Sequence, residues 1–209
     1  MTATMPAPVT LESDAVRLEP LSPSHVPELF LSGGGDDEVW RWLPVATPHT
    51  ETELAKIAAG LIHDRDLVPF AVVVKETGRA VGWTAYIDTP GFEESIEIGW
   101  TWYGRAVWRS GVNTSCKILL LDHAFDKLGV NRVQLKTDVL NTRSQAAVRR
   151  IGGVQEGVLR RHRRRPDGSW RDTAYFSILD DEWPAHRARL TRVEAPHTQR
   201  KTSARTGGG

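Results

Sequence analysis

The sequence has one cysteine among 209 residues and no apolar run long enough to cross a membrane. The single Cys116 excludes an intramolecular disulfide and a metal site built from several cysteines. The longest apolar stretches, such as residues 118–121, are far shorter than the ~20 residues of a membrane-spanning helix. The first ten residues have neither a basic start nor a long apolar segment, so we expect no signal peptide. We therefore expect a cytoplasmic protein without a metal and without a membrane partner.

The composition is that of an ordinary globular protein. Hydrophobic residues make up 40% of the chain and charged residues 25%, which is near the average for folded proteins and excludes wholesale disorder. We expect one domain over residues 14–183, preceded by a flexible segment over residues 1–13. Residues 184–209 are expected to hold the end of a helix and a disordered tail.

The net charge of +1 hides an asymmetry along the chain. Residues 1–140 hold 12 Lys and Arg against 19 Asp and Glu, whereas residues 141–209 hold 15 against 7. The basic part includes a run broken only by a histidine: Arg160, Arg161, Arg163, Arg164 and Arg165. Such a patch favours an anionic partner, which is a phosphate, a nucleic acid or an acidic protein surface. A solvated strand with its charges outward explains the pattern equally well.

Hydrophobic periodicity predicts a mixed α/β fold around one sheet. Alternating or β-branched runs predict strands over residues 16–21, 68–74, 80–87, 94–102, 132–137, 158–165 and 170–179. Helical stripes predict helices over residues 24–31, 50–64, 114–128 and 141–151. Turn residues predict one hairpin between the second and third strands and another between the last two. The fold therefore has about seven strands and about four helices.

The strand over residues 94–102 is expected to alternate between two faces. Ile96, Ile98, Trp100 and Trp102 would share one face, and the residues between them the other. The second face is the polar one, on which Glu97 is either solvated or available for chemistry.

The segment before the third helix offers a place for an anion. Residues 108–114 read Trp-Arg-Ser-Gly-Val-Asn-Thr and join a strand to a strongly apolar helix. Free N–H groups and the positive end of the dipole at a helix N-terminus bind phosphate. Gly111 lets a ligand approach the backbone closely, and Asn113 or Thr114 suits the N-cap. The segment matches neither a P-loop nor a dinucleotide-binding fingerprint, and an ordinary helix start has the same residues.

Several motifs in this order resemble those of the GNAT acetyltransferases, and within them the RimJ/RimL type of protein N-acetyltransferase. They are the strand Ile96-Glu-Ile-Gly-Trp, the loop 108–114, the phrase His123-Ala-Phe-Asp-Lys-Leu-Gly-Val-Asn-Arg-Val, and Asn141-Thr-Arg-Ser followed by Arg150-Ile-Gly-Gly. The resemblance covers residues 15–183. It implies a mostly antiparallel sheet with a central, splayed pair of parallel strands.

In the family that the chain resembles, the loop before the long helix holds the pyrophosphate of coenzyme A with backbone amides. The family motif Gln/Arg-x-x-Gly-x-Gly/Ala reads here Trp108-x-x-Gly111-x-Asn113, so the middle glycine matches and the flanking positions depart. The resemblance implies acetyl-CoA as co-substrate, with the thioester near residues 100–102. It implies these cofactor-binding residues: Trp100, Thr101, Trp102, Arg109, Ser110, Gly111, Val112, Asn113, Thr114, Asn141 and Ser144.

Acetyl transfer from a thioester to an amine needs a neutral amine and, less strictly, a proton for the leaving thiolate. Many relatives place a tyrosine on the last helix for this proton, but the corresponding position falls near Val148. Ser144 aligns instead with the serine assigned as proton donor in RimL-like enzymes, and its alternative is an exposed helical serine after an Asn141 cap. Glu97 is the first candidate for the base, through a water, and Asp138 is the reserve.

Aromatic and basic side chains are the candidates for binding the acceptor. Trp40, Trp42 and Trp83 could wall the acceptor site, although tryptophan usually fills a core. Arg161 and Arg163 belong to the arginine-rich hairpin, which borders the acceptor pocket in the family that the chain resembles. Guanidinium groups there suit an acidic acceptor, and a solvated edge strand is the alternative.

The sequence thus predicts an acetyl-CoA-dependent N-acetyltransferase that works by direct attack of an amine in a ternary complex, without a metal. The acceptor is the N-terminal amine of a protein, which could be ribosomal or acidic, or a small amine. The chain is expected to be a monomer or a homodimer. The alternative is a catalytically idle CoA-binding module whose arginine-rich hairpin binds RNA or a protein partner.

Overall fold

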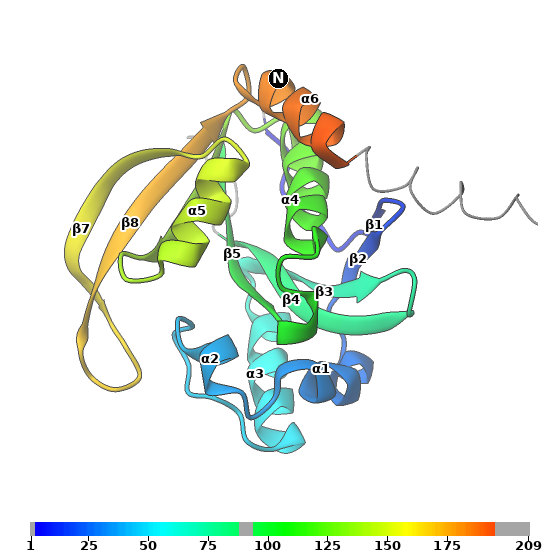
Figure 1. The fold of residues 1–209 in the computed structure, drawn as a ribbon, viewed down its shortest axis with the longest axis vertical. Coiled ribbons are helices and arrows are strands. Elements are labelled where there is room, and N and C mark those ends of the chain that lie inside the picture. Colours follow the sequence, from blue (N-terminus) through cyan, green and yellow to red (C-terminus); the bar gives the residue numbers. More distant parts are fainter. Residues whose placement is uncertain (1–2, 88–93, 195–209) are drawn as a thin grey trace, which may run out of the picture.

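The computed structural model of the chain describes residues 3–87 and 94–194. These residues form one sheet of eight strands in the order β1-β2-β3-β4-β5-β6-β8-β7 (Figure 1). The strands are β1 (Leu11–Glu12), β2 (Val16–Pro20), β3 (Leu67–Val74), β4 (Arg79–Ile87), β5 (Ser95–Tyr103), β6 (Arg132–Asp138), β7 (Val154–Arg164) and β8 (Trp170–Leu179). The helices are α1 (Val26–Gly33), α2 (Asp37–Trp40), α3 (Glu51–His63), α4 (Val112–Asp122), α5 (Thr142–Arg150) and α6 (Trp183–Glu194).

The mixed α/β fold and the central parallel pair are confirmed. β5 and β6 run parallel, and every other neighbouring pair of strands in the described sheet is antiparallel. The predicted hairpins form as β3–β4 and β7–β8. The eighth strand is the two-residue β1, which is too short to give a periodic signal.

The helices lie on both faces of the sheet and enclose two hydrophobic cores. The first core joins α4 and α6 to the sheet, with Leu121, Phe176 and Trp183 among its buried residues. The second core joins α1, α2 and α3 to the other face, with Leu29 and Leu54 among its buried residues. In the described part of the chain, no helix is both long and apolar enough to span a bilayer.

Several predicted ends are displaced for local reasons. α1 begins at Val26 because Pro23–His25 forms a 3₁₀ turn, whose cap pairs Ser22 with His25. α3 begins after Thr50, whose hydroxyl accepts a hydrogen bond from the Glu53 amide. α4 begins at Val112 and continues as a π-helical turn over His123–Leu128. The tail beyond residue 194 lies outside the described residues.

The predicted alternation of β5 is wrong at its centre. Ile96 and Ile98 belong to the first core, whereas Trp102 belongs to the second, on the opposite face. The register with β4 shifts here, because Gly99 pairs with Ala85 and Trp102 with Trp83. β5 therefore has an extra residue in a bulge, and Trp100 has a positive φ of 49°. A bulge of one residue reverses which side chains face a given core.

Candidate active site

The two parallel strands at the centre of the sheet stay together only at their beginnings. β5 pairs with β6 from Ser95 to Glu97, and no pairing is found from there to their ends at Tyr103 and Asp138. Beyond Glu97, the backbone N–H and C=O groups of β5 and β6 therefore form no hydrogen bonds with each other. We call this place the parting of the two strands. Unpaired strand edges of this kind form hydrogen bonds with an extended ligand.

The helix that follows β5 begins beside this parting with an uncapped N-terminus. Its N-cap is Gly111, with a φ of 93° and no side chain to cap the helix, and the Val112 amide donates a long hydrogen bond of 3.5 Å to the Ser110 hydroxyl. The prediction of Asn113 or Thr114 as N-cap is wrong, because the chain enters the helix two residues earlier through the left-handed glycine. A Cβ added to Gly111 would meet no atom within 4 Å, so the space beside these amides is open. An uncapped helix N-terminus in open space is a site for phosphate.

The start of α5 lies on the other side of the parting. Asn141 is the N-cap, and its Oδ1 accepts a hydrogen bond of 3.0 Å from the Ser144 amide. Capping, one of the two predicted roles of Asn141, is therefore observed. The Arg143 guanidinium lies 3.6 Å from the ring centroid of Trp108, in the loop before α4. This contact joins the two sides, and nothing in the sequence pairs residues so far apart.

A buried lysine on α4 donates a hydrogen bond to a threonine at the bulge of β5. Lys117 on α4 is 5% exposed, and its Nζ donates to Thr101 Oγ1 at 3.0 Å and to Thr84 Oγ1 at 3.4 Å. The two threonine hydroxyls are 2.8 Å apart. Burial lowers the pKa of Lys117 to about 8. We did not predict this residue, although it is a charged residue followed directly by four apolar residues in its helix.

Comparison with known proteins agrees with this geometry. A family model described as an acetyltransferase (GNAT) domain matches residues 15–154. The chain belongs to the GNAT acetyltransferases.

Individual relatives cover most of the chain. The uncharacterized N-acetyltransferase p20 of Bacillus licheniformis is 28% identical over 152 residues, which are 71% of this chain and 84% of that protein. A GCN5-related N-acetyltransferase from Brucella melitensis is 32% identical, with a TM-score of 0.89 over 93% of this chain and 89% of that one. Mycobacterium smegmatis RimJ in complex with CoA-disulfide is similar in fold, with a TM-score of 0.71 at 23% identity over 93% and 98% of the two chains.

The predicted base Glu97 is buried in an ion pair. It is 7% exposed, and its Oε2 lies 2.5 Å from Lys136 Nζ on β6. Lys136 also lies 5.0 Å from the ring centroid of Tyr175. Of the two alternatives, the solvated glutamate does not apply, because the carboxylate lies between β5 and β6 beside the parting.

The reserve base Asp138 is held by an arginine. It is 2% exposed, and Arg165 donates to its Oδ2 at 2.7 Å and to its Oδ1 at 3.0 Å. The Leu140 amide donates to Oδ1 at 2.9 Å. With both oxygens engaged, Asp138 fixes the β7–β8 hairpin to the end of β6, and this contact accounts for its burial.

The tryptophans expected at the acceptor site lie mostly in the second core. Trp40 and Trp83 are fully buried and pack against each other and against Trp102, with ring centroids 5.0 to 5.5 Å apart. Trp42 is half-buried beneath Arg41. The observed contacts of Trp40 and Trp83 are those of core residues, and a contact with the acceptor stays a prediction.

The arginine-rich strand does not alternate regularly. The register of β7 with β8 shifts between Leu159 and Arg163, and Arg161 has a φ of 48°. Arg161 and Arg163 are exposed, and the Arg161 amide donates to Asp172. The residue of this run that turns inward to the end of β6 is Arg165.

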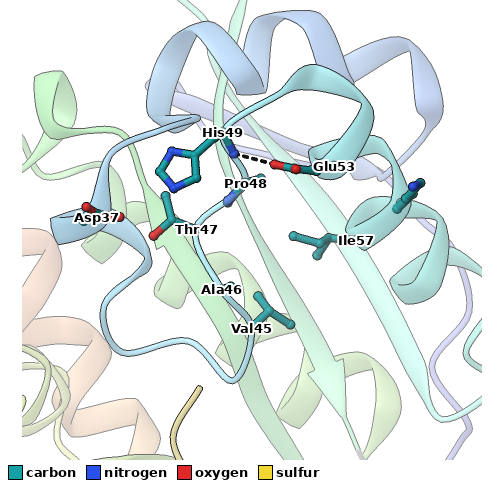
Figure 2. A pocket seen from close by; sticks show the side chains of 9 residues that line it. Asp37, Val45, Ala46, Thr47, Pro48, His49, Glu53 and Ile57 are labelled. Carbon is teal, nitrogen blue, oxygen red and sulfur yellow. Dashed lines mark hydrogen bonds between the residues drawn. The ribbon is translucent and has the colours of Figure 1, made fainter. Parts of the chain in front are cut away.

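The loop after α2 separates two hollows. One, of about 700 Å³, lies between this loop and α3, and includes Val45, Pro48 and Ile57 (Figure 2). No residue predicted to be catalytic or to bind the cofactor is among the described residues that line it. The other, of about 460 Å³, lies between the same loop and the β7–β8 turn, and Arg165 lines it. The same Arg165 forms the ion pair with Asp138 at the end of β6, which connects the second hollow to that end of the strand.

The described residues contain no cluster of three histidine, cysteine or acidic side chains that could hold a metal. The groups that we expect to act at the parting are instead backbone amides, the Ser144 hydroxyl and the Glu97 carboxylate, which is paired with Lys136. This set suits the binding and positioning of two organic substrates.

Proposed function

We propose that the chain is an acetyl-CoA-dependent N-acetyltransferase of the RimJ/RimL type, which acts in the cytoplasm and transfers an acetyl group to a primary amine. The single observation that carries the proposal is the parting of β5 from β6 beside the uncapped start of α4. An extended ligand in this space meets unpaired backbone groups along its length and a positive helix end at its phosphates. Acetyl-CoA has this form, because its pantetheine arm carries amides and its other half carries phosphates.

In this proposal the loop and the first turn of α4 bind the pyrophosphate. Backbone amides around Gly111 would donate to the phosphate oxygens, with Arg109, Ser110, Val112, Asn113 and Thr114 around them. The bulge of β5 over residues 100–102 would receive the thioester, where a backbone N–H stabilises the charge that develops on the carbonyl oxygen. Asn141 and Ser144 would border the arm from α5.

The reaction is a direct attack in a ternary complex. The lone pair of the neutral amine attacks the thioester carbon, the C–N bond forms, the C–S bond breaks, and coenzyme A leaves as its thiolate. Holding both reactants in the correct geometry supplies several kcal/mol of the required barrier reduction. The proton lost by the amine goes through a water to Glu97 and from there to solvent. Ser144 passes a proton to the thiolate and takes one from solvent, so both side chains return to their starting states.

The acceptor would enter on the side of the sheet opposite α4. There the hollow between the loop after α2 and the β7–β8 turn is lined by Arg165, whose guanidinium pairs with Asp138 at the end of β6. A relative from Bacillus subtilis, 29% identical over 63% of each chain, is provisionally named a ribosomal N-acetyltransferase, YdaF. This name supports a protein N-terminus as one class of acceptor, and small amines are the other.

The test is an amine panel with acetyl-CoA, in which coenzyme A release and the acetylated product are measured together. The panel contains short peptides with free N-termini, the same peptides with blocked N-termini, and small amines. We expect turnover with free N-termini and background release with blocked ones. Tight binding of coenzyme A without turnover on any amine would contradict the proposal and favour the idle CoA-binding module.

A further inference from the structure

Arg171 on β8 is a half-buried guanidinium without a partner. Among residues 3–87 and 94–194 it makes no hydrogen bond or ion pair, and its Nε is enclosed and has no acceptor. Burial is the main cause that lowers the pKa of Arg171 below its usual value. A guanidinium N–H that loses water without gaining an acceptor costs free energy, and a ligand that supplies the acceptor recovers it.

The carboxylates near Arg171 are already occupied. Asp138 and Glu97 both act on its charge, but Arg165 binds both oxygens of Asp138, and Lys136 binds Glu97. The other charged groups that act on Arg171 are the cations Arg163 and Arg165. The surroundings of Arg171 therefore hold more positive charge than the described side chains neutralise.

The position of Arg171 connects it to the acceptor side of the parting. Thr173 on β8 pairs with Asp138 at the end of β6, and Arg171 lies two residues beyond Thr173 on the same face. Tyr175 shares this face, whereas Phe176 belongs to the core beneath α4. Arg171 thus lies on the face opposite α4, next to the end of β6 where the strands have parted.

We propose that Arg171 forms an anion subsite within the acceptor site, and that it binds a carboxylate of the acceptor. This inference rests on the proposed N-acetyltransferase function and adds a substrate class to it: amines with a carboxylate close by. A guanidinium binds a carboxylate through two parallel hydrogen bonds. One guanidinium whose Nε has no acceptor balances one negative charge, which is the charge of a carboxylate and less than that of a phosphate dianion.

Two kinds of acceptor supply this chemistry. One is a peptide N-terminus followed by aspartate or glutamate, and the other is a free amino acid with its own α-carboxylate. The matched pairs are therefore a peptide with Glu against the same peptide with Gln at the second position, and an amino acid against its amide. Each pair differs by one charge and by almost no volume.

The variants distinguish binding of a carboxylate at Arg171 from a general effect of positive charge on acidic acceptors. Arg171→Gln removes the charge, and Arg171→Lys keeps the charge without the planar fork. Arg160→Gln is the control, because Arg160 is an exposed arginine of the same hairpin and is not among the charges that act on Arg171. Acetyl-CoA KM and the thermal unfolding midpoint of each variant show whether cofactor binding and folding are intact.

We expect wild type to prefer the acidic member of at least one pair by about tenfold or more in kcat/KM. Arg171→Gln should reduce the preference to within about twofold, Arg171→Lys should lie between, and Arg160→Gln should keep it. The pair that shows the preference identifies the source of the carboxylate. No preference in wild type, or an unchanged preference in folded Arg171→Gln, would overturn the inference.

A binding measurement keeps this test apart from the test of the transferase function. Calorimetric titration of the acidic and neutral peptides into the protein with coenzyme A needs no turnover. Preferential binding of the acidic peptide, lost in Arg171→Gln, supports the subsite even if acetyl transfer is absent. Equal binding of both peptides by wild type overturns the subsite even if acetyl transfer is observed.

Discussion

The two halves of the sheet differ in whether one face or both faces are buried by apolar residues. In β3 both faces are buried, because Phe70 and Val72 enter the first core while Ala71 and Val73 enter the second. In β8 the apolar residues Ala174, Phe176 and Ile178 enter the first core, whereas the residues between them form a polar face. The β1–β5 half is therefore a scaffold between two helical layers, and the β6–β8 half keeps one polar face, which we propose binds the acceptor. The strands part where these halves meet.

The first prediction concerns the scaffold half and has the largest expected effect. Trp83→Ala should lower the free energy of unfolding by about 3–5 kcal/mol, because it leaves a cavity between Trp40 and Trp102. Urea unfolding followed by circular dichroism measures the loss. The same substitution at half-exposed Trp170, in the other half, should cost less than about 1 kcal/mol. Similar losses at both positions would contradict the division into scaffold and substrate halves.

The second prediction concerns Lys117, which carries its charge inside the scaffold. Its folded pKa of about 8 lies below the value in the unfolded chain, so between pH 8 and about 10.5 the unfolded state binds more protons. Wild type should therefore gain about 3 kcal/mol of stability, relative to Lys117→Met, as the pH rises through this window. Urea unfolding of both proteins across the window measures the difference. A constant difference would show that the ammonium is not held in a desolvated site.

The third prediction concerns Ser144, at the boundary between the two halves of the sheet. Ser144→Ala should lower kcat by about tenfold or more and leave the KM for acetyl-CoA almost unchanged, since the proton is needed only in the transition state. Thr142→Ala, which removes an exposed hydroxyl from the same turn, should leave both constants unchanged. Steady-state kinetics with saturating acceptor distinguish the two. Equal turnover of Ser144→Ala and wild type would leave the serine a helix residue only.

The fourth prediction has the smallest effect and separates local strain from binding. Gly111→Ala and Gly129→Ala each place a side chain at a positive φ with no atom nearby, so both should lose about 1 kcal/mol of stability. Only Gly111→Ala displaces the amides at the start of α4, and it should weaken coenzyme A binding roughly fivefold or more. Calorimetry measures the affinities. Equal affinity in the two variants would remove the helix start from the CoA site.

The sequence predicted those elements correctly whose signal depends only on residues close together in the chain. The apolar run of β3, the helical stripe that begins at Thr50 and the hairpin turns are local signals, and the structure has each of them. The bulge at Trp100 was missed because an alternating apolar pattern looks the same whether or not the phase reverses. Tertiary contacts decided that Trp102 faces the second core.

The candidate site was predictable in part for the same reason. Asn141 marks a helix start that can be seen in the sequence, whereas the start of α4 at Gly111 was expected at least two residues later. The pairs Glu97–Lys136 and Asp138–Arg165, and the unpartnered Arg171, depend on which strands lie side by side. No spacing along the chain contains that information, so the acceptor face could not be described before the fold was known.

The most direct test of the central claim is the acetylation of a peptide N-terminus, followed by mass spectrometry and by coenzyme A release in one reaction. The protein is incubated with acetyl-CoA and a peptide whose free N-terminus precedes glutamate. The account predicts one acetyl group on the N-terminal nitrogen, formed in step with released coenzyme A and absent when the N-terminus is blocked. Bound coenzyme A without an acetylated product, on this peptide and on the whole amine panel, would contradict it.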